Sequence, residues 1–170
     1  SEVAVPGFLP DIPDVRKEIA QYYSSVHRAD EIVGAVLKAL EESGQRDNTL
    51  VMFLSDHGMP LPFAKTNCYR NSTQTPWIVR WPGVVSPGRV DGEHFISGID
   101  FMPTILEAVG IAQVDGMDGK SFLPVLRGEV DQHREYVYGV PTTRGVRNGT
   151  DYPNRSARGE RFTLIRTLNH

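Results

Sequence analysis

Asp56 and His57 are the two side chains whose types and position best suit a metal site. They follow a run of six residues, Thr49–Leu54, that reads TLVMFL and lacks alternation of polar and apolar positions. Such a run predicts a strand buried on both faces, as in the middle of the parallel sheet of an α/β domain. Ligand groups in these sheets lie just beyond the carboxyl ends of the strands, and Gly58 allows the chain to turn away there. Capping of the turn by Asp56 is the alternative reading.

The two adjacent side chains can face one point only beyond the end of the strand, because neighbours within a strand point to opposite faces. Together they form half of a metal site, since two ligands do not hold a metal ion alone. The sequence offers no obvious further ligands, because the remaining acidic candidates lie in turn or helix-cap contexts that explain them without a metal. These candidates are Asp91, Asp100, Asp115 and Asp118.

Lys65 lies nine residues beyond Asp56, in the long polar loop Met59–Thr75. Loops of more than about 12 residues inside a compact domain are usually functional or disordered. We expect this loop to fold back, so that Lys65 can hold an anionic ester group as a point charge. A solvated surface cation is the alternative. Cys68 has no evident base nearby, so we interpret it as a buried structural thiol.

The elements around these residues follow from periodicity and breaking residues. Apolar residues recur every three or four positions from Val15 to Leu40, which predicts a helix of about 30 residues that ends at Gly44. After the buried strand and the long loop, a short apolar strand is expected at Trp77–Trp81 and another at His94–Ser97. A helix over 101–110, capped by Ser97 or Asp100, and a short helix within 115–129 complete this part.

The tail of the chain has a different character. Strands are predicted at 136–140, 142–147 and 161–167, separated by residues typical of turns, which indicates an antiparallel element distinct from the α/β part. We place the boundary near residues 128–134. The predicted organisation is an α/β part over residues 1–130 and the start of a small C-terminal antiparallel β subdomain over residues 131–170.

Composition excludes several classes of function. The 170 residues include 39% hydrophobic and 23% charged residues, and the formal net charge is −3. The basic residues are scattered, so nothing favours nucleic acid as a partner. No apolar run approaches the roughly 20 residues of a membrane span. The single cysteine excludes an intrachain disulfide framework.

Several segments, taken in order, resemble the sulfatase family of the alkaline-phosphatase-like superfamily. They read TLVMFLSDHG, KTN, TPWIVRWPG and SGIDFMPTILEAVG. VPGFLPDIPDVRKEIAQYYSSVHRAD, YPNRS and RFTLIRTLN are similar to the sulfamidases within that family. The resemblance implies part of a sulfatase fold, a mainly parallel sheet flanked by helices with a small antiparallel β element at the C-terminus. It also implies hydrolysis of sulfate esters or sulfamates of glycans.

The resemblance assigns roles to three residues. Asp56 matches a calcium ligand, and His57 matches the next ligand position, which is Asn in many sulfatases and His in others. Calcium prefers oxygen ligands, so the nitrogen of His57 leaves the identity of the metal open. Lys65 matches the basic residue that contacts the sulfate group.

The departures from the family are as informative as the matches. Sulfatases use a formylglycine made from Cys or Ser in a C/S-x-P/A-x-R motif, and neither Cys68 nor Ser86 has that context. The acidic ligand pair near the N-terminus of the family is also absent. We interpret the chain as a fragment, the middle to later part of a sulfatase, that is inactive alone.

A fragment of this kind implies partners. We expect a sulfated glycan substrate and the missing N-terminal part of the same protein, and we expect the isolated chain to aggregate, oligomerise or require that part. The family is periplasmic, secreted or lysosomal. Two alternatives remain open: a phosphodiesterase or phosphonate hydrolase of the same superfamily, with His57 on zinc or manganese, and a non-catalytic module. The KTN segment and the C-terminal similarity favour the sulfatase.

Overall fold

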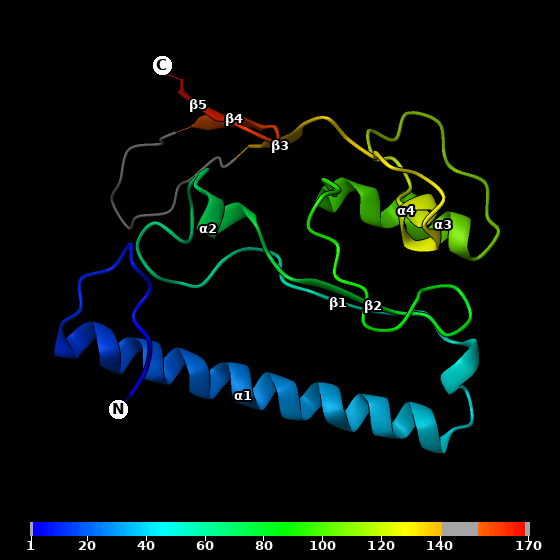
Figure 1. The fold of residues 1–170 in the computed structure, drawn as a ribbon, viewed down its shortest axis with the longest axis horizontal. Coiled ribbons are helices and arrows are strands. Elements are labelled where there is room, and N and C mark those ends of the chain that lie inside the picture. Colours follow the sequence, from blue (N-terminus) through cyan, green and yellow to red (C-terminus); the bar gives the residue numbers. More distant parts are fainter. Residues whose placement is uncertain (1, 141–152, 169–170) are drawn as a thin grey trace.

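A long helix and two small antiparallel sheets dominate the computed structural model, which describes residues 2–140 and 153–168 (Figure 1). Helix α1 (Pro13–Glu42) has 30 residues, as its periodicity predicts. Pro13 occupies the first turn, where its missing N–H costs nothing. Gly44 follows the end of the helix with a φ of 71°, a left-handed conformation that glycine adopts without strain. No helix in the described part of the chain is long and apolar enough to cross a membrane.

Strands β1 (Val51–Leu54) and β2 (Trp77–Arg80) form the first sheet after the short 3-10 helix η1 (Arg46–Asn48). Both strands are predicted from the sequence, but the expected parallel pairing is wrong for β1. The strands run antiparallel, with Val51 opposite Arg80 and Leu54 opposite Trp77. The connection between them, residues 55–76, holds the four-residue helix α2 (Arg70–Thr73) and not the longer helix that usually joins parallel strands.

The expectation that β1 is buried on both faces is also wrong within the described residues. Phe53 is 40% exposed, Leu54 is 37% exposed, and Ile78 on β2 is 60% exposed. A strand with one hydrogen-bonded neighbour in a two-stranded sheet lacks the covering layers that a central strand has. The apolar run therefore predicts the strand itself, whereas burial of the strand needs covering layers that the described residues do not supply.

The next segment forms the best-buried part of the structure. It contains the 3-10 helix η2 (Gly98–Asp100), helix α3 (Phe101–Ala108) and helix α4 (Leu123–Arg127). The predicted strand at His94–Ser97 is absent, because Ser97 instead enters η2 as its N-cap and forms a capping box with Asp100. Phe122 and Leu123 are almost fully buried, and the ring of Phe122 meets Trp77 edge-on at a centroid distance of 5.0 Å.

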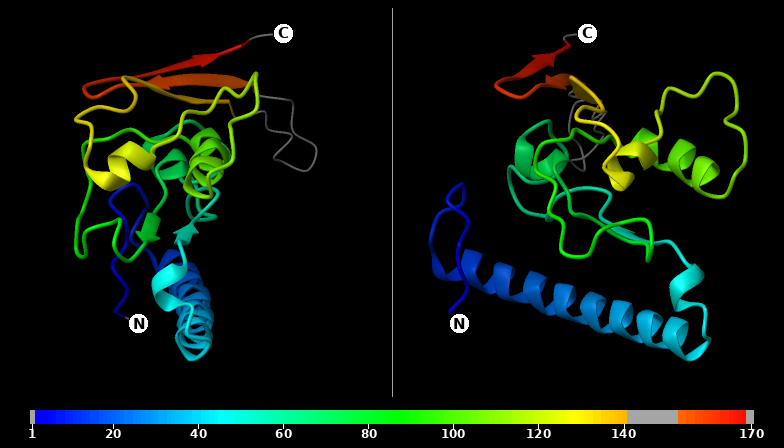
Figure 2. Two further views of the ribbon diagram at one scale, coloured as in Figure 1. Left: turned by 90° about the vertical axis from the view of Figure 1, so that its right-hand side faces the viewer. Right: turned by 45° about the vertical axis from the view of Figure 1, so that its right-hand side comes forward.

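The second sheet contains β3 (Val137–Gly139), β4 (Asn154–Arg158) and β5 (Thr163–Thr167), in that order and antiparallel. The predictions at 136–140 and 161–167 are confirmed, β4 is not predicted, and the strand predicted at 142–147 lies outside the described residues. Figures 1 and 2 show this sheet and α1 at opposite ends, with β1, β2 and α2 between them. The α/β class with a small antiparallel element near the C-terminus is confirmed.

Candidate functional site

The site predicted at the end of β1 is a pair of side chains that face each other. Nε2 of His57 lies 3.5 Å from Oδ2 of Asp56, and the Asp56 side chain is 84% exposed. Nδ1 of His57 lies 2.8 Å from the carbonyl oxygen of Gly58, which can only accept, so Nδ1 carries the proton. In the neutral imidazole, Nε2 is then an electron-pair donor directed at a carboxylate. A cation between the two groups, or a proton on Nε2, satisfies this arrangement.

The donor set fits a shared cation but does not complete its coordination. A carboxylate oxygen and an imidazole nitrogen suit zinc or manganese. The carboxylate oxygen also suits calcium, which prefers oxygen to nitrogen ligands. The described residues contain no group of three or more His, Cys, Asp or Glu side chains that could hold a metal ion. The role of Asp56 and His57 as half of a metal site therefore stays a prediction.

Gly58 is the point where the loops of the site meet. Its N–H donates to the carbonyl oxygen of Ser72 at 3.1 Å. A Cβ at Gly58 would lie 1.9 Å from the carbonyl oxygen of Asn71 and 2.4 Å from that of Ala64. The sequence predicts Gly58 from its freedom to turn, but the structure requires it for this close approach of three backbone segments.

The long loop does fold back, and it carries Lys65 next to this contact. Ala64 is fully buried, and its N–H donates to the carbonyl oxygen of Leu61 at 3.1 Å, whereas Lys65 is exposed. Phe63 and Thr66 flank this pair with φ values of 64° and 59°. Left-handed conformations cost about 1–3 kcal/mol each in residues with a Cβ and persist where the surroundings hold them, often at functional sites.

Asn67 is a residue of this loop that the sequence analysis missed. Its Nδ2 donates to the carbonyl oxygen of Lys65 at 2.8 Å, and its Oδ1 accepts from the N–H of Tyr69 at 2.9 Å. The signal in the sequence is an asparagine two positions after a lysine in a polar loop, because asparagine side chains commonly bond to nearby backbone. Cys68 beside it is buried, as predicted for a structural thiol.

Two of the four acidic residues set aside in the sequence, Asp91 and Asp100, have the turn and cap roles expected of them. Asp91 accepts from the N–H groups of Glu93 and His94 in a turn, and the side chain of Asp100 closes the capping box of η2. Asp115 and Asp118 are exposed.

Asp100 makes more hydrogen bonds than its role as a helix cap requires. It is fully buried and accepts hydrogen bonds from Arg134, from Nε2 of His133 at 3.2 Å and from the N–H of Lys120 at 2.8 Å. Burial alone would raise the pKa of this carboxyl, but the hydrogen bonds, with Arg134 foremost, hold it below the usual 3.8.

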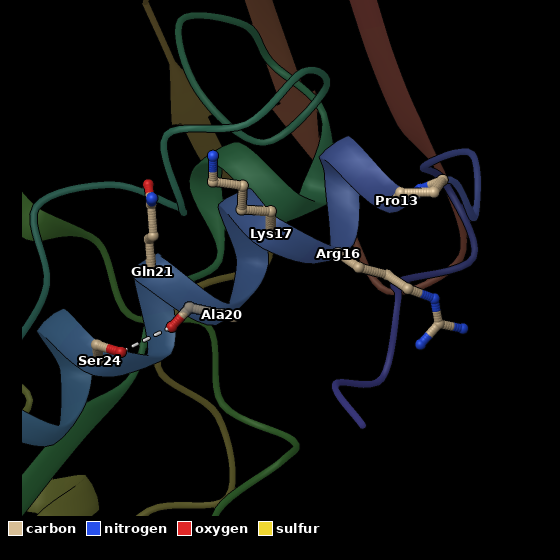
Figure 3. A pocket seen from close by; sticks show the side chains of 6 residues that line it. All are labelled: Pro13, Arg16, Lys17, Ala20, Gln21 and Ser24. Atoms are coloured by element: carbon tan, nitrogen blue, oxygen red, sulfur yellow. Dashed lines mark hydrogen bonds between the residues drawn. The ribbon is translucent and has the colours of Figure 1, made fainter. Parts of the chain in front are cut away.

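A hollow of about 430 Å³ lies elsewhere, along the first half of α1 (Figure 3). Its lining contains none of the predicted site residues. Arg16 at its edge is already bound to both carboxylate oxygens of Asp11 and to the carbonyl oxygen of Val3, and Lys17 points in a different direction. The hollow therefore does not compete with the end of β1 as a reaction site. It is lined by Pro13, Arg16, Lys17, Ala20, Gln21 and Ser24.

Comparison with known proteins decides the family. The sulfatase family profile matches residues 4–111, a segment that includes Asp56, His57 and Lys65. The chain belongs to the sulfatase family. An ulvan-active sulfatase from Formosa agariphila is 35% identical over 153 residues, and human N-sulphoglucosamine sulphohydrolase is 33% identical over 177 residues. These alignments cover 90% and 99% of the chain.

The solved structure of a 2-O GAG sulfatase has the same fold over most of this sulfatase chain. The two share a TM-score of 0.73 and 26% sequence identity over 82% of the chain and 31% of that structure. The chain likewise spans 30% of the Formosa relative and 34% of the human relative. The sulfatase family and fold are thus shown, while the assignment of Asp56, His57 and Lys65 to the active site remains a prediction.

Proposed function

We propose that this chain is the middle to later part of a longer sulfatase that hydrolyses sulfate esters or sulfamates of glycans. Asp56, His57 and Lys65 provide part of its active site. The observation that carries this assignment is the contact at Gly58, which brings the strained loop of Lys65 against the segment that holds Asp56 and His57. The missing N-terminal part of the polypeptide supplies the other metal ligands and the formylglycine motif that this sequence lacks.

Within this proposal each residue has a physical task. A divalent cation, with calcium the family's usual one, and a formylglycine would supply Lewis-acid and nucleophilic chemistry at sulfur. The Asp56 carboxylate and Nε2 of His57 would provide two of the ligands of this cation. The Lys65 ammonium neutralises charge on the sulfate oxygens as the bond breaks, because a positive charge held in place stabilises the negative charge that develops there.

The substrate class follows from the relatives. Their names refer to ulvan, to N-sulphoglucosamine and to GAG, which supports a sulfated glycan as the substrate of this protein. A periplasmic, secreted or lysosomal location agrees with such a substrate and with the family resemblance. The 170-residue chain alone is expected to be inactive, because half of the metal site and the nucleophile lie outside it.

Substitution of Lys65 tests this function in the complete polypeptide. Lys65→Met should lower kcat/KM for sulfate release by about 100- to 1,000-fold, as loss of one donor at a developing negative charge does elsewhere. Lys65→Arg should keep most of the activity because it keeps the charge. Lys38→Met on the exposed face of α1 removes a lysine whose only described partner is Glu42, and it should change nothing.

Two outcomes would contradict the proposal. Full activity of Lys65→Met would remove Lys65 from the site. The protein would instead be assigned to phosphoester chemistry if it cleaved phosphodiesters and not sulfate esters. In that case zinc or manganese, and not calcium, should restore the activity after chelation.

A further inference from the structure

We infer that Asn67 is a positioning residue of the proposed active site, because its side chain holds the strained turn that carries Lys65 and joins that turn to the segment of Asp56 and His57. The inference rests on the proposed function for the role of Lys65. Asn67 itself acts only through Lys65, so its loss should displace the ammonium group without removing any group that touches the substrate.

The hydrogen bond from the Asn67 side chain spans Thr66, the residue with the strained backbone. Thr66 has a φ of 59°, which is a true outlier for a β-branched residue. The bond from Nδ2 of Asn67 to the carbonyl oxygen of Lys65, at 2.8 Å, spans Thr66 and closes the turn around it. Without this bond, Thr66 is free to return to an ordinary conformation, and the backbone of Lys65 moves with it.

The other end of the Asn67 side chain reaches the metal half-site through a short path of hydrogen bonds. Oδ1 of Asn67 accepts from the N–H of Tyr69 at 2.9 Å, and the carbonyl oxygen of Tyr69 accepts from the N–H of Ser72 at 3.0 Å. The carbonyl oxygen of Ser72 in turn accepts from the N–H of Gly58 at 3.1 Å. Asn67 therefore links Lys65, by way of helix α2, to the residue that follows His57.

The burial pattern separates this role from a general contribution to stability. The loop is anchored in the interior by Ala64 and Cys68, which are 0% and 2% exposed. Asn67 is only half-buried and bonds to two backbone groups of the loop itself. Its loss should loosen the turn while the anchors and the rest of the fold remain in place.

The test uses the complete polypeptide and three variants. Asn67→Ala should lower kcat/KM for sulfate release between about tenfold and a hundredfold, the scale of a displacement of about 1 Å in an active site. Its melting temperature should stay close to that of the wild type. Asn71→Ala is the matched control, an exposed asparagine four residues further on, and should keep wild-type activity.

Relief of the strain provides the decisive comparison. Glycine adopts a positive φ without steric cost, so Thr66→Gly should restore most of the activity when it is added to Asn67→Ala. Wild-type kcat/KM in Asn67→Ala would overturn the inference. So would a loss of activity that follows the melting temperature and that Thr66→Gly does not recover.

Hydrogen exchange separates failure of this inference from failure of the proposed function. If the wild type releases no sulfate, the proposed function fails, and exchange of the Tyr69 amide then decides the role of Asn67. Faster exchange in Asn67→Ala than in Asn71→Ala would support a turn held by Asn67. Equal exchange in the two variants would overturn it.

Discussion

Gly58 illustrates how a single residue can join the parts of the candidate site. Because its missing Cβ would meet two carbonyl oxygens at 1.9 and 2.4 Å, any side chain must push apart the backbone of Asn71 and Ala64. We expect Gly58→Ala to lower the free energy of unfolding by about 1–3 kcal/mol, the usual cost of overpacking, or more because backbone must move. Urea unfolding measures this change.

Gly34 provides the control for this substitution. It lies inside helix α1, and a Cβ there would meet nothing within 4 Å. Gly34→Ala should therefore raise the free energy of unfolding by about 0.5–1 kcal/mol, because alanine favours a helix interior over glycine. A Gly58→Ala protein as stable as the wild type would show that the three segments do not approach each other so closely.

The residue scale also shows what the sequence can predict about the site. The position of Asp56 and His57 at the end of β1 follows from the apolar run that precedes them, and the fold-back of the Lys65 loop follows from its length. The left-handed conformations of Phe63 and Thr66 could not be predicted, because both residue types disfavour them and only the surrounding contacts hold them. Asn67 was missed because its two hydrogen bonds, to the backbone of Lys65 and of Tyr69, depend on the path of the loop.

At the scale of elements, existence was easier to predict than pairing. The period of α1 and the apolar runs of β1 and β2 are local signals, and all three elements are present. The antiparallel pairing of β1 and β2 depends on the path of residues 55–76, which local composition does not encode. Strand β4 was missed because it reads NRSAR, with Ala157 as its only apolar residue.

The exposed pair on the first sheet leads to a prediction about association. Phe53 and Ile78 lie opposite each other in the register of β1 and β2, and both are exposed. We expect the 170-residue chain to self-associate through this apolar face, and Ile78→Lys to reduce that association. Stability should change by no more than about 0.5 kcal/mol, because Ile78 is already 60% exposed. Light scattering after size exclusion measures the change in mass.

Val90→Lys is the matched control for this experiment. Val90 is 92% exposed and lies outside the two sheets, so a lysine there adds the same charge without altering the apolar face. Equal association of the Val90→Lys and Ile78→Lys proteins would assign the effect to net charge. Association unchanged in both would contradict the role of this sheet face.

At the scale of the whole molecule, Asp100 joins segments that are distant in sequence. It binds the backbone of Ser97 and Lys120 and the side chains of His133 and Arg134, so it ties the start of α3 to the approach to α4 and to the segment before β3. The side chain of His133 is 2% exposed, and its Nε2 lies 3.2 Å from the carboxylate. Protonation at this point should therefore affect the stability of the whole structure.

The sign of this effect follows from the direction of the two pKa shifts. Burial lowers the pKa of His133 below 6.5, despite the opposing hydrogen bond to Asp100, and Arg134 and Lys120 add to the lowering. The unfolded chain then binds the proton more readily, so the stability that His133 contributes is complete above about pH 6.5 and is lost as the pH falls toward its folded pKa. The lowered pKa of Asp100 acts in the same direction, but only below its usual value of 3.8.

His133→Gln isolates the contribution of the imidazole. Glutamine places an amide donor near the position of Nε2 and does not titrate. The melting temperature of the His133→Gln protein should therefore fall less than that of the wild type between pH 7.5 and pH 5.5. The other four histidines, His27, His57, His94 and His170, are present in both proteins, so their contribution is the same on both sides of the comparison. Parallel pH profiles would show that His133 does not titrate differently in the folded and unfolded states. A steeper loss in His133→Gln would show that the buried imidazole is charged in the native structure, with Asp100 as its counter-ion.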